Sequence, residues 1–325
     1  MLIGIIVMLS MIGCSAHSAT TKESPLSTGN LSADNPVSTT DKDLFMSFHD
    51  STGQQVSLPH KPARIVILNT EVLELFYQLG GKTVGHTTAP GTSVPEQAQS
   101  STDVGPINQV SIEKITSLEP DLVIGHPIFH TSLKEALTTT NTPLALIKMD
   151  SYEDILQTAK LLGHMLEKQQ ETELALQDTK QRIQAITNKL PNQSPKFALI
   201  TIMSMGVSLQ KSGSIALDIA NQLKLTNVAA GMQAGAMPSA VPYSIEKLIE
   251  ADPDYLFVIA YGTEEYGKAK LKEDLGNNPA WASLRAVKEN KLFILPADFV
   301  NSPGLKIDQT LMRLAILIYP EIYGN

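Results

Sequence analysis

The chain has 325 residues, a formal net charge of −8 at pH 7, and 42% hydrophobic residues. This length is sufficient for two domains with buried cores, and the acidic balance argues against a nucleic-acid partner, which needs clustered Lys and Arg. Because Cys14 is the only cysteine, an intrachain disulfide and a cysteine-based zinc site are excluded.

The N-terminus has the composition of a secretion signal. An apolar run that is too short to cross a membrane ends at Cys14, although no Lys or Arg precedes it as in most signal peptides. Residues 11–14, Met-Ile-Gly-Cys, resemble a lipobox, so we expect residues 1–14 to be a signal peptide and Cys14 to be lipidated. Residues 15–43 are rich in Ser and Thr, which is typical of a disordered tether. The order predicts a lipid-anchored, extracytoplasmic protein, on the periplasmic side if the cell has two membranes.

Residues 44–150 show the alternation of strand and helix that builds a parallel sheet. Residues 45–56 predict a hairpin around the turn Asp-Ser-Thr-Gly. A helix is expected at 71–79, and short apolar runs predict buried strands at 64–68, 121–125 and 144–147.

Residues 151–190 break this rhythm, because their apolar residues recur at helical spacing with no strong breaker before Pro191. They predict a long helix, interrupted once at most, that connects two lobes. The α/β rhythm then restarts in residues 191–325. Strands are expected at 197–202, 255–259 and 292–295, and helices at 214–223 and 307–318. The predicted fold class is therefore α/β, with two lobes of mainly parallel sheet.

Two segments of the chain repeat one another. Ser-Ile-Glu-Lys occurs at 111–114 and at 244–247, and Pro-Asp follows each copy at the same spacing. Each copy predicts a helix capped by its serine and ended before the proline, followed by a buried strand. A copy on either side of the helical stretch indicates two related lobes, although a serine cap followed by Pro-Asp also occurs in unrelated α/β proteins.

These repeats, the helical stretch and residues 278–288, 291–294 and 317–321 resemble the solute-binding proteins of ABC importers for iron complexes and cobalamin. The resemblance covers about residues 44–325 and is greatest to lipid-anchored receptors for haem and siderophores. It implies two α/β lobes joined by one long rigid helix, with the ligand in the cleft between them. It also implies a partner, the importer permease with its ATPase.

Glu113 and Glu246 occupy the same place in the two repeats. In the resembled family a glutamate at this place on each lobe docks onto arginines of the permease, which assigns these two residues that role. Contacts between carboxylate and guanidinium are strong and geometrically specific. The alternative is a glutamate that only stabilises the first turn of its helix through the helix dipole.

Open α/β sheets bind ligands at the carboxyl ends of their strands. A methionine at a strand end suits either an adaptable binding pocket or simple core packing. The loop histidines 126 and 130 suggest either a zinc site or polar lining of the cleft, and Pro127 disfavours a regular helix between them. The rule selects ten candidate ligand-binding residues: Asn69, Thr70, His86, Asn108 and His130 on the first lobe, and Met203, Met205, Tyr243, Tyr261 and Phe299 on the second.

Tyr261 stands, in Ala-Tyr-Gly, where the resembled haem receptors have an iron-ligating histidine. A tyrosinate also ligates haem iron, and the alternative is a tyrosine that lines the pocket; His130 is a candidate haem ligand from the opposite lobe. Asn108 falls where such a receptor uses methionine. The absence of an Arg cluster in the selected loops favours haem, a neutral hydroxamate or a corrinoid over an anionic siderophore.

We therefore predict a monomeric binding lipoprotein that delivers haem or a ferric siderophore to an ABC importer, with cobalamin as the alternative ligand. A two-lobed α/β enzyme is the alternative from another class. The chain has no Gly-x-Ser-x-Gly elbow, phosphate-binding loop or dinucleotide fingerprint, so no enzymatic activity and no intrinsic cofactor are expected. A structural lipoprotein or adhesin would leave the paired glutamates unexplained.

Overall fold

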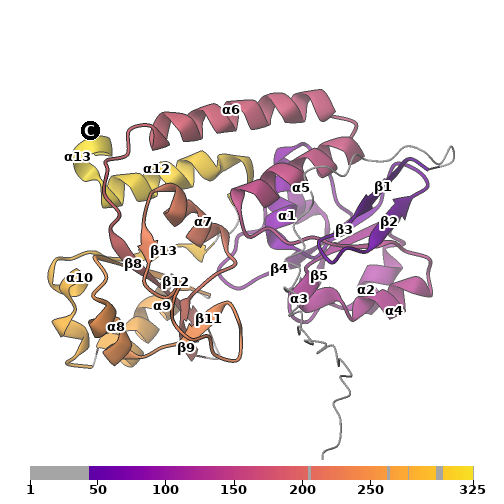
Figure 1. Ribbon diagram of the computed structural model, residues 1–325. Coiled ribbons are helices and arrows are strands. Elements are labelled where there is room, and N and C mark those ends of the chain that lie inside the picture. The colour runs from indigo at the N-terminus through magenta and orange to yellow at the C-terminus, as the bar shows by residue number, and fades with distance from the viewer. Residues whose placement is uncertain (1–43, 204–205, 262–263, 277, 298–302, 325) are drawn as a thin grey trace, which may run out of the picture.

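The computed structural model describes residues 44–203, 206–261, 264–276, 278–297 and 303–324. The predicted signal peptide, Cys14, the tether, Met205 and Phe299 lie outside these residues. Two α/β lobes lie side by side, and helix α6 (Gln169–Thr187) runs along the top of both in Figure 1. Among the helices of the described residues, none combines the length and apolar composition that a membrane crossing requires.

The N-terminal lobe contains a five-stranded sheet in the order β5-β4-β3-β6-β7, and all four strand pairs are parallel. The order reverses between β3 and β6, which creates a switch point of the kind where α/β sheets bind ligands. Its strands are β3 (Ile65–Ile67), β4 (Gly85–Thr88), β5 (Thr102–Pro106), β6 (Leu122–Gly125) and β7 (Leu144–Leu146). The predicted hairpin is present as the antiparallel pair β1 (Met46–His49) and β2 (Gln55–Leu58).

Five short helices complete this lobe and connect its strands. They are α1 (Thr70–Gln78), the 3-10 helix η1 (Glu96–Ser100), α2 (Ile112–Ser117), α3 (Pro127–His130) and α4 (Leu133–Thr138). Helix α3 corrects the expectation that Pro127 prevents a helix, because proline is tolerated in a first turn, where its missing N–H has no partner to lose.

The sheet of the C-terminal lobe is mixed, with three parallel and two antiparallel strand pairs. Its order is β11-β9-β8-β12-β13, with β10 also paired to β8. Strands β8, β10, β12 and β13 run parallel. Strand β9 is antiparallel to both of its neighbours, β8 and β11. The strands are β8 (Lys196–Met203), β9 (Gly206–Gln210), β10 (Thr226–Asn227), β11 (Ala240–Pro242), β12 (Tyr255–Ala260) and β13 (Leu292–Leu295).

The helices of this lobe include α12 (Ile307–Ile318), whose bounds are those predicted from its apolar periodicity. The others are α7 (Ile215–Gln222), α8 (Ile245–Ala251), α9 (Glu264–Lys270), the π-helix η2 (Leu271–Gly276), η3 (Trp281–Ser283), α10 (Arg285–Lys288), η4 (Gly304–Lys306) and α13 (Pro320–Tyr323). Both sheets fall within the predicted lobes, 44–150 and 191–325, and the domain boundaries themselves stay a prediction.

The connection between the lobes consists of two helices, α5 (Tyr152–Met165) and α6. The chain turns between them at Glu167, whose φ is 57°. Gly163 of α5 lies so close to Thr172 of α6 that a Cβ on the glycine would overlap the threonine side chain. The predicted helix over 151–190 is therefore interrupted once, and α6 alone spans the two lobes (Figure 1).

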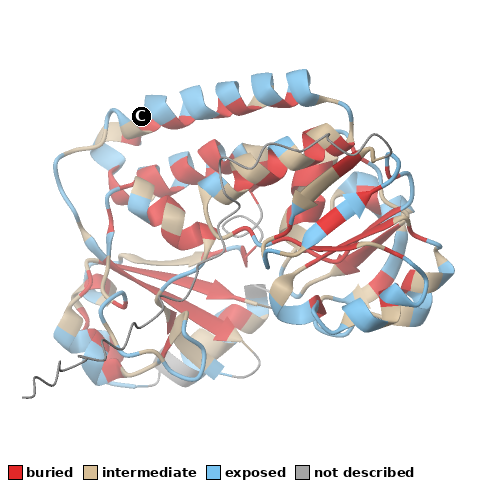
Figure 2. Ribbon diagram, turned by 45° about the vertical axis from the view of Figure 1, so that its right-hand side comes forward, coloured by how far each residue is buried: buried red, intermediate tan, exposed pale blue. Residues whose placement is uncertain are grey.

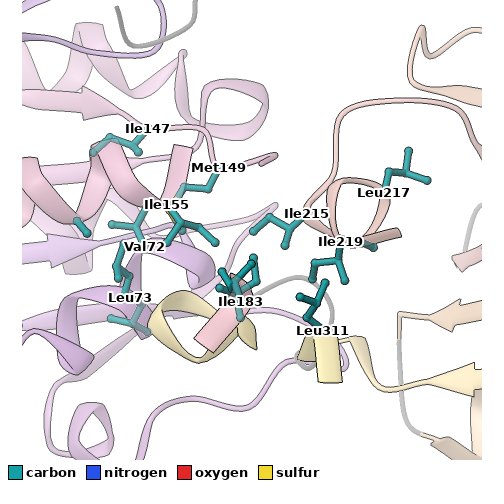
Figure 3. Close-up of a cluster of buried hydrophobic side chains, with 14 of the residues drawn as sticks. Val72, Leu73, Ile147, Met149, Ile155, Ile183, Ile215, Leu217, Ile219 and Leu311 are labelled. Atoms are coloured by element: carbon teal, nitrogen blue, oxygen red, sulfur yellow. The ribbon is translucent and has the colours of Figure 1, made fainter. Parts of the chain in front are cut away.

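One apolar cluster is shared by both lobes and by the connecting helices. Figure 3 shows side chains from α1, α5, α6, α7 and α12 meeting in this cluster, and the underside of α6 is buried in Figure 2. Members that are at most 6% exposed include Val72, Ile155, Ile183, Ile219 and Leu311. Because separation of the lobes would expose this surface to water, the cluster opposes large lobe movements.

The two repeated units fold alike. Ser111 caps α2 and Ser244 caps α8, each accepting a hydrogen bond at 3.2 Å from the backbone N–H three residues on. The aspartate of each Pro-Asp pair accepts a backbone N–H from the start of the neighbouring strand, at 2.9 Å for Asp121 and 2.7 Å for Asp254. The residue before each proline has a left-handed backbone, with φ of 46° and 43°. The repeat is thus structural as well as sequential.

Candidate functional site

A cavity of about 520 Å³ lies at the junction of the lobes. The N-terminal lobe contributes Thr70 and Glu74 of α1 and residues 92–96, which follow β4. The C-terminal lobe contributes residues from the end of β13 to α12: Pro296, Pro303, Lys306, Gln309, Thr310 and Arg313. Thr70 is the one predicted ligand-binding residue among those that line this cavity.

Two cations of the cavity, Lys306 and Arg313, were missed by sequence reasoning. That reasoning considered loops at strand ends, whereas these residues lie just before and within the C-terminal helix α12. Residues seven apart lie on the same face of a helix, and this spacing is the feature of the sequence that could have identified them as a pair. The selected strand-end loops were predicted to lack an Arg cluster, and that prediction is unaffected, because Arg313 and Lys306 enter the lobe junction from outside those loops.

A second cavity, of about 460 Å³, lies between α1, α6 and η4 and shares Glu74, Pro95 and Lys306 with the first. Beside it, Gln78 at the end of α1 holds the other lobe directly. Its amide oxygen accepts a hydrogen bond from Leu305 N at 2.6 Å, and its amide nitrogen donates to Pro303 O at 3.2 Å. We call this contact the Gln78 latch, and it fixes the spacing of the lobes at one point.

Gly304, between the two residues that the latch holds, has a φ of 51°, and a Cβ there would overlap the Gln78 side chain. We expect Gly304→Ala to lower the free energy of unfolding by about 2–3 kcal/mol, from backbone strain and overpacking together. Urea unfolding measures this loss. Gly53→Ala is the matched control, because Gly53 has a φ of 79° with open space around it. An equal loss in both variants would contradict the overlap with Gln78.

Asn69, His86 and His130 support the strand ends rather than line a cleft. Asn69 is 0% exposed, caps α1 with its amide oxygen, and donates to Ile147 O at 2.8 Å. The buried ring of His86 is hydrogen-bonded through Nδ1 to the Ser101 hydroxyl at 2.8 Å, and burial lowers its pKa. Side chains so occupied are not available to a ligand, which corrects these expectations.

His130 is 1% exposed, and both of its ring nitrogens have partners. Nδ1 accepts from His126 N at 2.9 Å, and Nε2 donates to Ile107 O at 2.9 Å. The ring therefore has no nitrogen left for haem iron or zinc, which corrects its assignment as a candidate haem ligand. Within the described ranges no group of three or more His, Cys, Asp or Glu residues could hold a metal ion.

The other predicted residues keep accessible surface. Asn108 is exposed, whereas Met203 and Tyr261 are half-buried at the ends of β8 and β12. The backbone N–H of Tyr261 donates to Ile202 O at 2.9 Å, which places its side chain just beyond the paired region of the sheet. Tyr243 is half-buried, and its hydroxyl has no hydrogen-bond partner among the described residues. Burial raises its pKa to about 12.

Glu71, in the first turn of α1 after β3, is a further ionisable residue at the strand ends. Burial, and secondly the nearby charge of Asp150, raise its pKa to about 8. The carboxyl group is therefore largely protonated at neutral pH and acts as a hydrogen-bond donor as well as an acceptor. The sequence shows that Glu71 follows a predicted strand closely, but it carries no signal of this protonation state.

Glu113 and Glu246 are both exposed and lie in the first turns of α2 and α8. The Ser244 hydroxyl donates to the Glu246 carboxylate at 2.8 Å. Hydrogen bonds from its own backbone and from Ser244 lower the pKa of Glu246. Helices α2 and α8 both lie at the bottom of Figure 1, on the side away from α6. The helices that carry the two exposed glutamates thus lie on a common side of the molecule.

Comparisons with known proteins agree with this architecture. A family model described as periplasmic binding protein matches residues 65–299. The uncharacterized ABC transporter substrate-binding lipoprotein YvrC of Bacillus subtilis is 24% identical over 86% of this chain and 87% of its own length. The Fe(3+)-citrate-binding protein YfmC of the same organism is 25% identical, over 81% and 82%. The crystal structure of S. aureus IsdE complexed with heme has a TM-score of 0.69 at 18% identity, covering 79% of this chain and 98% of IsdE. The predicted two-lobed fold is confirmed.

Proposed function

This chain belongs to the periplasmic binding protein family, and on that premise we propose that it captures an iron complex and delivers it to the permease of an ABC importer. Members of the family are the substrate-binding proteins of such transporters, so the chain is a binding protein and not an enzyme, as predicted. The ligand and the residues that bind it are part of the proposal.

The exposed pair Glu113 and Glu246 is the observation that carries this proposal. The two glutamates occupy equivalent positions in the repeated units, and the helices that carry them, α2 and α8, lie on one side of the molecule. A permease that binds one glutamate per lobe is anchored to both lobes at once, and charge-assisted contacts with arginine give such an anchor strength and orientation. A glutamate needed only for helix stability has no reason to be matched in this way.

The cavity at the lobe junction supports a ligand with carboxylate groups. Lys306 and Arg313 line it together with hydroxyl-bearing residues, and basic groups favour anionic ligand oxygens. A relative named for Fe(3+)-citrate points in the same direction. A ferric carboxylate complex or haem, which carries two propionates, fits this chemistry. Cobalamin, whose side chains are mostly neutral amides, is the alternative.

Location and assembly belong to the proposal as well. A relative named as a substrate-binding lipoprotein supports a lipid anchor at Cys14 and a place outside the cytoplasmic membrane. We propose a monomer, since the paired glutamates of one chain already supply a carboxylate from each lobe. If the ligand is haem, Tyr261 at the end of β12 is the proposed iron ligand.

Calorimetric titration of the purified protein with haem, ferric citrate and cyanocobalamin tests the ligand. One-to-one binding of haem or ferric citrate is expected, with iron-free citrate as the control for the latter. A Soret shift that Tyr261→Phe removes would assign the iron ligand. Binding of cyanocobalamin alone would move the ligand to the alternative class, and binding of none of the three would contradict the proposed ligands.

A further inference from the structure

The side chain of His126 stands at the carboxyl end of β6, beside the switch point between β3 and β6. Its ring is half-buried and lies next to the ring of Phe129, with centroids 5.3 Å apart. Sequence reasoning weighed this residue with His130 as a zinc pair. The two rings do not form a zinc pair, because both nitrogens of the His130 ring are already hydrogen-bonded, Nδ1 to the backbone N–H of His126 and Nε2 to Ile107 O.

The hydrogen bonds of His126 determine where its ring proton lies. Nδ1 accepts the backbone N–H of Ile128 at 3.1 Å, which closes the first turn of α3. In a neutral imidazole the accepting nitrogen carries no proton, so the proton is on Nε2. Burial, and secondly the neighbouring charges of His130 and Lys148, lower the pKa of His126 to about 4. The ring is therefore neutral at pH 7, with Nε2–H as its donor.

This donor has no partner within the described part of the chain. The hydrogen bonds between His126 and α3 use Nδ1, the backbone N–H or the backbone carbonyl of His126, and none uses Nε2. Among the described residues, four side-chain polar atoms are buried without a hydrogen bond: Tyr152 Oη, Thr158 Oγ1, Thr172 Oγ1 and Tyr243 Oη. Nε2 of His126 is not one of them, so this unpaired atom is not fully buried. A donor that is neither buried nor paired is open to solvent at the edge of the sheet.

Apolar side chains border this donor. Ile128 is 79% exposed and Phe129 is 44% exposed, and both lie in α3, the helix that His126 caps. Large apolar groups this exposed beside a switch point are typical of a surface that contacts a ligand or partner. A molecule with an acceptor oxygen next to an apolar body would satisfy the donor and cover these side chains at once.

We propose that His126 determines ligand specificity, donating a hydrogen bond from Nε2 to an oxygen of the bound molecule while Ile128 and Phe129 contact its apolar part. This inference rests on the proposed function. The oxygen belongs to a carboxylate, a hydroxamate or an amide, and the histidine does not ligate iron. To ligate through Nε2, the ring would have to move its proton to Nδ1 and lose the bond to Ile128 N–H.

Two substitutions in the full chain separate the two functions of the ring. His126→Asn keeps an acceptor for the Ile128 N–H, since asparagine is a good cap, but it is too short to reach the Nε2 position. His126→Gln reaches that position with an amide donor and gives up the cap. With whichever probe the wild type binds among haem, ferric citrate and cyanocobalamin, His126→Asn should weaken binding about tenfold, and His126→Gln by less than about threefold.

Thermal unfolding of both variants controls for damage to α3, because the cap loss in His126→Gln should lower the Tm more than His126→Asn does. Unchanged affinity in His126→Asn would overturn the inference and leave the proposed function intact. Loss of an iron-dependent absorption band in His126→Asn would overturn it too, since it would make the histidine an iron ligand. A wild type that binds none of the probes would overturn the proposed function, and this inference with it.

Discussion

Replacement of both Glu113 and Glu246 by glutamine should reduce ligand import about a hundredfold or more while leaving ligand affinity unchanged. Each glutamate is exposed, and the helix that carries it lies on the side of the molecule away from α6. A hydrogen bond between charged groups contributes about 1.5–3 kcal/mol, so each single variant should lose about tenfold and the pair the product of the two. Uptake in cells and stimulation of the importer ATPase in proteoliposomes both measure the effect.

The control for this experiment is the pair Glu135→Gln and Glu250→Gln. Both residues are exposed helix glutamates, one in each lobe, and neither lies at the repeated first-turn position. The control pair changes the net charge of the protein by the same amount and should leave import intact. Equal loss of import in both pairs would show a general charge effect, and full import in the Glu113 and Glu246 pair would contradict docking through these residues.

Glu71→Gln should stabilise the protein in a pH-dependent way. The raised pKa means that the folded protein keeps a proton on Glu71 between its ordinary value of 4.5 and about 8, where the unfolded chain has lost it. Below pH 4.5 Glu71 is protonated in both the folded and the unfolded protein, so its contribution to the free energy of unfolding is fully present there. This contribution is lost as the pH rises towards 8. Glutamine does not titrate, so the advantage of the variant over wild type should be small at pH 5 and should grow by about 3–4 kcal/mol by pH 8.

Urea unfolding of both proteins at pH 5, 6.5 and 8 measures this gain, and the comparison at pH 5 serves as the reference. A second variant tests the cause. Asp150 is the secondary source of the raised pKa of Glu71, and it is also paired with Lys148 at 2.5 Å. Asp150→Asn should lower the pKa of Glu71 and so reduce the gain from Glu71→Gln in that background. A gain that is constant across the pH range would refute a proton held on Glu71.

The pattern of apolar residues predicted the helices that bury one face and the strands that bury a continuous run of residues. The bounds of β13 and α12 are as expected, because an uninterrupted apolar run and an amphipathic period carry the same information as burial. The position of the break between α5 and α6 was not predicted, because the chain turns at Glu167 and neither glycine nor proline marks that turn. The antiparallel strands β9 and β11 were also missed, as they are short and partly exposed.

The site was less predictable than the fold for a physical reason. A polar residue at a strand end can face a cleft or bond to the backbone beneath it, and residue type does not distinguish the two. Asn69 and His130 take the second course and use their polar atoms within the scaffold. Conversely, Lys306 and Arg313 enter the lobe junction from a helix that follows the last strand, outside the loops that the strand-end rule considers.

The shared apolar cluster and the Gln78 latch bear on how the importer tells a loaded receptor from an empty one. Lobes that are already fastened together lose little conformational entropy when a ligand arrives, which favours rapid capture. The same fastening keeps Glu113 and Glu246 at nearly one separation whether the receptor is occupied or not. A permease that touches only these two carboxylates would then gain little information about occupancy. Discrimination would have to come from the mouth of the cleft, where a bound molecule alters the surface itself.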